Sequence, residues 1–335
     1  MNLHKEAGLC GSCLTLDLKA ADFQEIKSKT PSQGGIILKQ TLQALKESTY
    51  CSLCRLIVHA VEDTRAEWQK AEKLADEDIT CQLRAIPYRF PTPKTFKVLD
   101  VTTNFPFFGS SYGIQLLPVE SDDSDDQLIG RIIDPSRISI RLVQNWLMKC
   151  VVDHGDSCTS SKTLRFKEIE SILRVIDVEQ GCIVSPTDEF RYIALSYVWG
   201  QTKSVTLVKG NLDRLQKPDG ITNIFKDLSL VIQNAIELTR ALGEKYIWID
   251  SLCIIQDDWD IKSKIIHKMN LVYENAFLTI IAASGTDANT GLPGVGYTTR
   301  SFEQATATVN KDLKFIYPPP HAGLSASVWA SRGWT

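Results

Sequence analysis

The stretch that decides the fold is Tyr246-Ile-Trp-Ile-Asp250-Ser-Leu-Cys253-Ile-Ile-Gln-Asp257-Asp258-Trp259. Four apolar or aromatic residues precede the first acid, an apolar patch surrounds the cysteine, and two more acids follow. This pattern predicts a buried strand that ends in carboxylates. Because ligands bind at the carboxyl ends of strands in open α/β sheets, Asp250, Asp257 and Asp258 are the candidate catalytic residues.

The segments around this stretch alternate between strand and helix patterns. Strands are expected at 192–196, 246–249 and 277–283, with an amphipathic helix in each interval. Such alternation is typical of parallel strands joined by right-handed crossovers, and the continuous apolarity of 277–283 is typical of a strand covered on both faces. We therefore expect an α/β fold with a mostly parallel sheet flanked by helices, a flavodoxin-like core with insertions.

The chain divides into three parts by composition. Residues 1–126 form an N-terminal α+β module with cysteine pairs and three strand candidates, and its end is marked by the acidic run 120–126. Residues 127–189 supply a connecting helix and strand packed on the core. Residues 190–335 form the C-terminal domain that contains the acidic strand end.

The composition is that of an ordinary globular protein and argues against some functions. Of 335 residues, 43% are hydrophobic and 23% are charged, with a net charge of −3. This balance gives no global attraction to nucleic acid, which disfavours a zinc-dependent nucleic-acid binder. The chain shows no long apolar window and no N-terminal signal core, so we expect no membrane span and a cytoplasmic or nuclear protein.

Nine cysteines occur, and four of them form two C-x2-C pairs, Cys10 with Cys13 and Cys51 with Cys54. In a reducing compartment such pairs are thiols or metal ligands rather than disulfides. Two pairs suit a tetrahedral zinc ion because each pair presents two thiolates from one tight turn or helix start. The separation between the pairs exceeds the common zinc-ribbon range, so two unrelated reduced pairs are the alternative interpretation.

A second group of potential ligands follows the helix that opens near Asp134. Cys150 and His154 lie one helical turn apart, with Cys158 beyond them and Cys182 as a conceivable fourth ligand. Nothing in this spacing requires a metal. A buried cysteine and a histidine near a helix C-terminus are the favoured interpretation.

Four blocks occur together and in order: Tyr192-Ile-Ala-Leu-Ser-Tyr-Val-Trp-Gly200, Tyr246 to Asp258, Met269-x3-Tyr273-x2-Ala276, and Ser331-Arg-Gly-Trp-Thr335. Together they resemble the HET domain of fungal heterokaryon-incompatibility proteins, over roughly residues 190–335. The resemblance implies an effector of regulated fungal cell death, acting in the cytoplasm through self-association or with other incompatibility proteins.

The resemblance also implies a distant relation to TIR domains, some of which cleave NAD at the nicotinamide-ribose bond. That reaction needs a carboxylate near the ribose and a cradle for the base. NAD is then the expected substrate, and the three acids would supply the charge. The ligand-binding set that follows is Ser196, Tyr197, Trp199, Gly200, Cys253, Arg332 and Trp334.

One departure from the family pattern favours a different class of function. The family usually carries a glutamate about one turn before the methionine of the third block, and Ile265 stands at that position here. An apolar side chain cannot act as a catalytic acid. The alternative to a NAD glycohydrolase is therefore a non-catalytic signalling or assembly module that acts through protein-protein interaction. Separately, the structural interpretation of Trp199, Trp334 and Cys253 is that they are buried core residues.

Overall fold

The structure is a computed structural model that describes residues 8–23, 35–67, 74–88, 96–104, 114–119, 130–155, 167–186, 190–301, 303–318 and 327–331. Contacts divide the chain into two compact units. The first contains residues 1–133 and 303–319, and the second contains residues 134–302 and 320–335. A late segment of the chain therefore belongs to the first unit.

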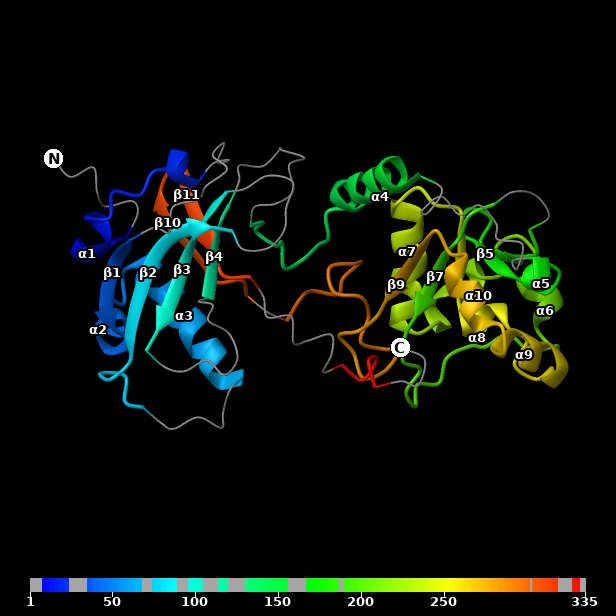
Figure 1. The fold of residues 1–335 in the computed structure, drawn as a ribbon. Helices are drawn as coiled ribbons and strands as arrows, with labels where there is room; N and C mark the ends of the chain where they lie inside the picture. Colours follow the sequence, from blue (N-terminus) through cyan, green and yellow to red (C-terminus); the bar gives the residue numbers. More distant parts are fainter. Residues whose placement is uncertain are drawn as a thin grey trace. The chain divides into compact units, whose positions relative to one another are not determined.

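The first unit is built on a six-stranded sheet in the order β1-β2-β3-β4-β11-β10, with every neighbouring pair antiparallel (Figure 1). Its strands are β1 (Ile36–Thr41), β2 (Thr80–Pro87), β3 (Lys97–Thr103), β4 (Ile114–Pro118), β10 (Thr306–Asn310) and β11 (Leu313–Ile316). Its helices are α1 (Gly11–Leu14), the 3-10 helix η1 (Ala20–Phe23), α2 (Leu42–Glu47) and α3 (Ser52–Glu67).

The core of the first unit lies between one face of this sheet and α3. Alternate residues of β2 and β3, such as Leu83, Leu99 and Val101, are buried in one cluster with Leu53 and Ile57 of α3. The first half of β2 shows the period-two pattern of a strand that buries one face, whereas β3 is buried at four consecutive residues, Val98 to Val101.

The second unit contains a five-stranded sheet in the order β6-β5-β8-β7-β9. Its strands are β5 (Val175–Asp177), β6 (Cys182–Val184), β7 (Ile193–Ser196), β8 (Tyr246–Trp248) and β9 (Leu278–Ile281). Its helices are α4 (Ile140–His154), α5 (Lys167–Glu170), α6 (Leu212–Leu215), the 3-10 helix η4 (Thr222–Asp227), α7 (Leu230–Ala241), α8 (Asp250–Cys253), α9 (Trp259–Ile266) and α10 (Met269–Glu274). Among the described residues, no helix combines the length and apolarity needed to cross a bilayer.

The expectation of a mostly parallel sheet flanked by helices is wrong. Strand β7 pairs in parallel with β8 and β9, as the alternation over 192–283 indicates. However, β5 pairs antiparallel with both β6 and β8, and the sheet of the first unit is antiparallel throughout. The short turn at Gly181, with a φ of +60°, is the physical reason for the pairing of β5 with β6, because a tight turn can join antiparallel strands only.

Strand β9 also departs from its expected setting. It lies at the edge of the sheet, three of its residues are half-buried, and Ile281 is exposed. Its apolar run therefore did not indicate a strand covered on both faces.

The parallel part of the sheet is held by burial on α7 and by one buried hydrogen bond. The apolar face of α7, formed by Val231, Ile232, Ala235 and Leu238, is buried, and Gly243 follows the helix with a φ of +80°. Tyr192, at the start of β7, donates from its hydroxyl to the carbonyl oxygen of Val272 on α10 at 2.5 Å. The hydrogen bond therefore joins the start of β7 to α10.

The inclusion of the late strands in the first unit can be tested at β11. Phe315 is fully buried and packs edge-on against Phe23 at 4.9 Å between ring centroids. Truncation of a buried phenylalanine leaves a cavity, so Phe315→Ala should lower the free energy of unfolding by about 3–5 kcal/mol. Lys314→Ala, at the exposed neighbouring position, is the control and should change it by less than about 0.5 kcal/mol in urea denaturation. Equal effects of the two substitutions would contradict the buried placement of Phe315.

Candidate functional site

The acid at the end of β8 is held by a tryptophan from the end of β7. Trp199 donates from Nε1 to both carboxylate oxygens of Asp250, at 3.1 Å to Oδ1 and 2.9 Å to Oδ2. The backbone N–H of Ser251 donates to Oδ1 at 2.7 Å. Trp199 is 40% exposed, so the pair lies at an accessible edge of the unit.

Other residues of the first block surround this pair. The Tyr197 hydroxyl lies 2.9 Å from Oγ of Ser251, and burial raises the pKa of Tyr197 well above its usual range. Ser196 accepts at Oγ from Nε1 of Trp329 at 2.8 Å. Gly200 has a φ of +64°, and a Cβ there would lie 2.4 Å from Cβ of Asp287, so this position requires glycine. The fold thus gathers the first block and Asp250 at one edge.

The other two candidate acids bind the backbone and a lysine instead. Asp257 accepts at Oδ1 from the backbone N–H of Lys209 at 2.8 Å. Asp258 caps α9 by accepting from the N–H of Ile261 at 3.2 Å, and it pairs with Nζ of Lys209 at 3.1 Å. The Ile261 N–H and the lysine hold the pKa of Asp258 below its usual value. The three acids therefore do not face one another.

Two further positions lie inside the core. Cys253 is fully buried, burial raises its pKa to about 12, and the N–H of Ile249 donates to its Sγ at 3.3 Å. It is a neutral thiol and does not face an accessible surface. Ile265, at the position where the sequence resemblance leads us to expect a glutamate, is 1% exposed in the same core. Arg332 and Trp334 lie outside the described residues.

Sequence reasoning missed one charged residue near this edge. Arg174 precedes β5, which pairs antiparallel with β8 through Ile176 and Ile247, so Arg174 lies toward the same end of the sheet as Asp250. Its Nε and Nη1 atoms are buried and have no hydrogen-bond partner among the described residues. The charges of Arg174 and Asp250 both act on the Cys253 thiol, where they have opposite effects on its pKa. No motif could have identified this arginine, because its proximity comes from antiparallel pairing.

The two C-x2-C pairs meet in the first unit. Cys10 and Cys51 directly precede α1 and α3, and all four sulfurs lie within 4.8 Å of one another. The Sγ of Cys54 lies 3.7 Å from that of Cys10 and 3.6 Å from that of Cys13. A tetrahedral site with zinc-sulfur bonds of about 2.3 Å separates its sulfurs by about 3.8 Å, whereas a disulfide bond is only about 2.05 Å long. The donor set and its spacing therefore fit a metal ion.

The electrostatics of the cluster favour deprotonation of one thiol. A hydrogen bond from Cys13 holds the pKa of Cys51 far below its ordinary value, and the same interaction raises the pKa of Cys13. Thiolates are the form of cysteine that ligates metals. Buried thiolates carry negative charges that repel one another. A cation at the centre of the four sulfurs would offset this negative charge.

The second group of potential ligands does not form such a cluster among the described residues. Cys150 Sγ and His154 Nδ1 lie 3.4 Å apart on α4, and Cys182 is buried on β6 near Gln180. Cys158 lies outside the described residues. Within the part of the chain that the structure describes, the four-cysteine cluster is the one group with metal-ligand spacing.

Comparison with known proteins identifies one family. Residues 192–335 match the family model described as Heterokaryon incompatibility protein (HET), so this segment of the chain is a HET domain. The recognition made from the four sequence blocks is thereby confirmed over these residues. No curated protein and no solved structure matches the chain.

The cap at Asp258 predicts a pH-dependent contribution to stability. Asp258→Ala should lower the free energy of unfolding at pH 7, because it removes the cap and the Lys209 pair. The pKa of Asp258 in the folded protein is below the pKa of an aspartate in the unfolded chain, which is about 3.9. The stabilisation by Asp258 is therefore fully present when the pH is above the unfolded-state pKa. It is lost as the pH falls through the folded-state pKa. The difference from wild type should narrow between pH 7 and pH 3 in urea denaturation. Asp260→Ala, an exposed acid in the same first turn, is the control, and a gap that widens at low pH would contradict the assignment.

Proposed function

We propose that the chain is an effector of heterokaryon incompatibility whose HET domain binds a nucleotide at the carboxyl end of β8. The family match carries the biological role. The pair of Trp199 and Asp250, in which one indole N–H contacts both carboxylate oxygens, carries the assignment of the binding edge.

The chemistry of this edge suits the parts of a nucleotide. An exposed indole offers a face on which a base can stack, a contact that contributes about 1–3 kcal/mol in single-stranded nucleic-acid binders. A carboxylate at a strand end can accept hydrogen bonds from ribose hydroxyls. Arg174 has two buried donors without a hydrogen-bond partner in the part of the chain that the structure describes, and it would attract a phosphate, since a guanidinium recognises phosphate oxygens in a bidentate manner.

NAD cleavage at the nicotinamide-ribose bond is the reaction that this edge would support. The positive charge that develops on the ribose in such a reaction is stabilised by a nearby carboxylate. Asp250 is the acid placed for that role, because Asp257 and Asp258 bind the Lys209 segment. A single carboxylate therefore carries the proposed chemistry.

A second candidate is a signalling module that binds the nucleotide without cleaving it. The observation that favours it is Ile265, which replaces the family glutamate and is buried in the core. A carboxylate at this position would lose its hydration without gaining a charged partner. Position 265 therefore contributes to the hydrophobic core and not to catalysis in this candidate. In this case nucleotide binding would regulate assembly with other incompatibility proteins.

Nucleotide binding can be tested with NAD itself. Trp199→Ala should weaken NAD binding about tenfold in isothermal titration calorimetry, because it removes the stacking face and releases Asp250. Trp259→Ala is the matched control, since Trp259 is 77% exposed on α9 and makes no contact with Asp250. It should bind NAD as the wild type does.

The same samples separate the two candidates. Release of nicotinamide by the wild type, reduced about 10²-fold in Asp250→Asn, would support cleavage. Binding without release would support the signalling module. If folded wild-type protein shows no saturable binding, the nucleotide proposal is wrong in both forms.

We propose zinc as the ion of the four-cysteine cluster. Four cysteine sulfurs at tetrahedral spacing are typical of a structural zinc site, in which protein ligands fill all four coordination positions. The ion would tie α1 to the start of α3 and so stabilise the first unit. No step of the proposed HET chemistry depends on it.

Metal analysis tests this proposal directly. Wild-type protein should contain about one zinc per chain, and the double substitution Cys51→Ser with Cys54→Ser should remove it and lower the thermal stability. Cys81→Ser is the control, because Cys81 is a buried cysteine on β2 outside the cluster. Unchanged zinc content in the double variant would exclude the four-thiolate site.

A further inference from the structure

A glycine-rich loop after β9 is tied to α7 by a buried asparagine. Asn234 is 2% exposed, and its Oδ1 accepts from the N–H of Leu292 at 2.9 Å and from Oγ1 of Thr298 at 3.0 Å. Gly291 has a φ of +73°, and a Cβ there would lie 2.4 Å from the Thr298 hydroxyl. A glycine at position 291 therefore allows the loop backbone to lie close to α7.

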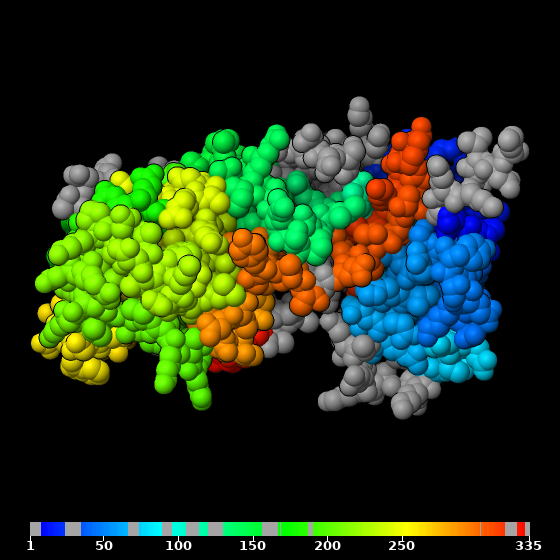
Figure 2. Space-filling view, turned by 180° about the vertical axis from the view of Figure 1, so that it is seen from behind, coloured from blue at the N-terminus to red at the C-terminus, as the bar shows by residue number. Residues whose placement is uncertain are grey.

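The same loop is tied to the segment that precedes α4. Arg300 donates from its backbone to the carbonyl of Pro135 at 2.7 Å, and its guanidinium donates to the carbonyls of Asp134 and Arg137. The N–H of Ile138 donates to the carbonyl of Gly294 at 2.8 Å. Figure 2 shows the loop, in orange, beside the teal segment that leads into α4 and the yellow-green helix α7. These contacts hold three segments in a defined arrangement.

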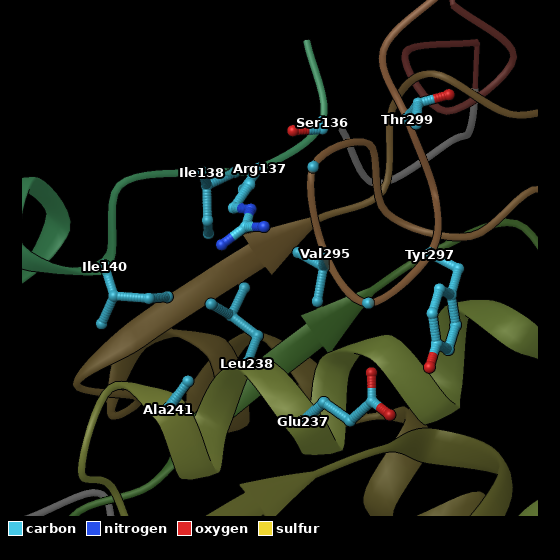
Figure 3. A pocket seen from close by; sticks show the side chains of 12 residues that line it. Ser136, Arg137, Ile138, Ile140, Glu237, Leu238, Ala241, Val295, Tyr297 and Thr299 are labelled. Atoms are coloured by element: carbon cyan, nitrogen blue, oxygen red, sulfur yellow. The ribbon is translucent and has the colours of Figure 1, made fainter. Parts of the chain in front are cut away.

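A cavity of about 540 Å³ opens between these three segments, a volume within the usual range of ligand pockets. Most of its wall is apolar, from Ile138 and Ile140, from Leu238 and Ala241 of α7, and from Val295 of the loop (Figure 3). Tyr297 is fully exposed at the cavity. This wall can bury apolar side chains of a ligand.

Two opposite charges line the cavity without pairing to each other. Glu237 projects from α7 and Arg137 from the segment before α4, with Leu238 and Val295 drawn between them in Figure 3. Neither side chain forms a salt bridge with a described residue, and Glu237 accepts one long hydrogen bond, from Asn234 at 3.4 Å. Glu237 is half-buried, so its charge is incompletely solvated. A ligand with complementary charges would satisfy both groups.

We propose that this cavity binds a short peptide segment of a partner protein, in which apolar side chains lie between a basic and an acidic residue. The basic residue would pair with Glu237, and the acidic residue would pair with the guanidinium of Arg137. The apolar residues would cover Leu238 and Val295, and Tyr297 would border them as an aromatic contact of the kind enriched at binding hot spots. This site shares no residue with the proposed nucleotide edge, so either can fail without the other.

The test uses the full chain and fluorescein-labelled peptides in fluorescence anisotropy. The probes are Lys-Leu-Leu-Glu and Glu-Leu-Leu-Lys, which cover both directions, and the neutral Gln-Leu-Leu-Gln. One charged peptide should bind saturably and about tenfold more tightly than the neutral one. Glu237→Gln and Arg137→Gln should each reduce this advantage of the charged peptide, while Gln-Leu-Leu-Gln should bind each variant as it binds the wild type.

Glu179→Gln and Arg214→Gln are the controls, because both residues are exposed in the second unit and do not line the cavity. They should leave all affinities unchanged. Equal binding of charged and neutral peptides, absence of saturable binding, or equal losses in the control variants would overturn the proposal. Unchanged binding of the neutral peptide by each variant shows that the variant is folded, so a weaker affinity for the charged peptide reports the loss of a charge pair.

Discussion

The parallel pairing of β7 with β8 is the constraint on which the HET domain depends. Ile193 and Ala194 lie opposite Ile247 and Trp248, and all four are buried. Because parallel strands end at the same edge of a sheet, the first block and the acidic block of the sequence must meet there. The bond from Trp199 to Asp250 is a consequence of that register, and a shift by one residue would turn every side chain to the other face.

The acids after β8 show how one sequence cluster can serve different purposes. Asp250 is presented at an accessible edge, whereas Asp257 and Asp258 organise the segment at Lys209 and the start of α9. Like charges that each have their own partner need not share a site, so closeness in the sequence does not make these three acids one catalytic group. The edge is consequently better suited to bind a ligand with one essential carboxylate than to employ an acidic triad.

Local patterns predicted the alternation of strands and helices over 192–283, because periodicity reflects the face that each element buries. The two C-x2-C motifs left a zinc site and two unrelated pairs as alternatives, and only the tertiary fold brings Cys10 and Cys54 together across 44 residues. Local patterns could not predict the antiparallel pairing of β5 with β8, nor the position of Arg174 that follows from it. They also gave no sign that Glu237 and Arg137 line one cavity, since a hundred residues separate them and only tertiary packing joins their segments. The partner of Asp257 is another contact of this kind.

The return of residues 303–319 to the first unit bears on the order in which the protein matures during synthesis. Strand β11 pairs with β4, so β4 has an uncovered edge until residues 313–316 have left the ribosome. An unpaired edge is a template for association with other chains, and it would persist while the whole of residues 134–302 is made. The HET segment, which contains both late strands, therefore completes a sheet whose preceding strand, β4, ends almost 200 residues earlier, and a chain released before them would expose that edge permanently.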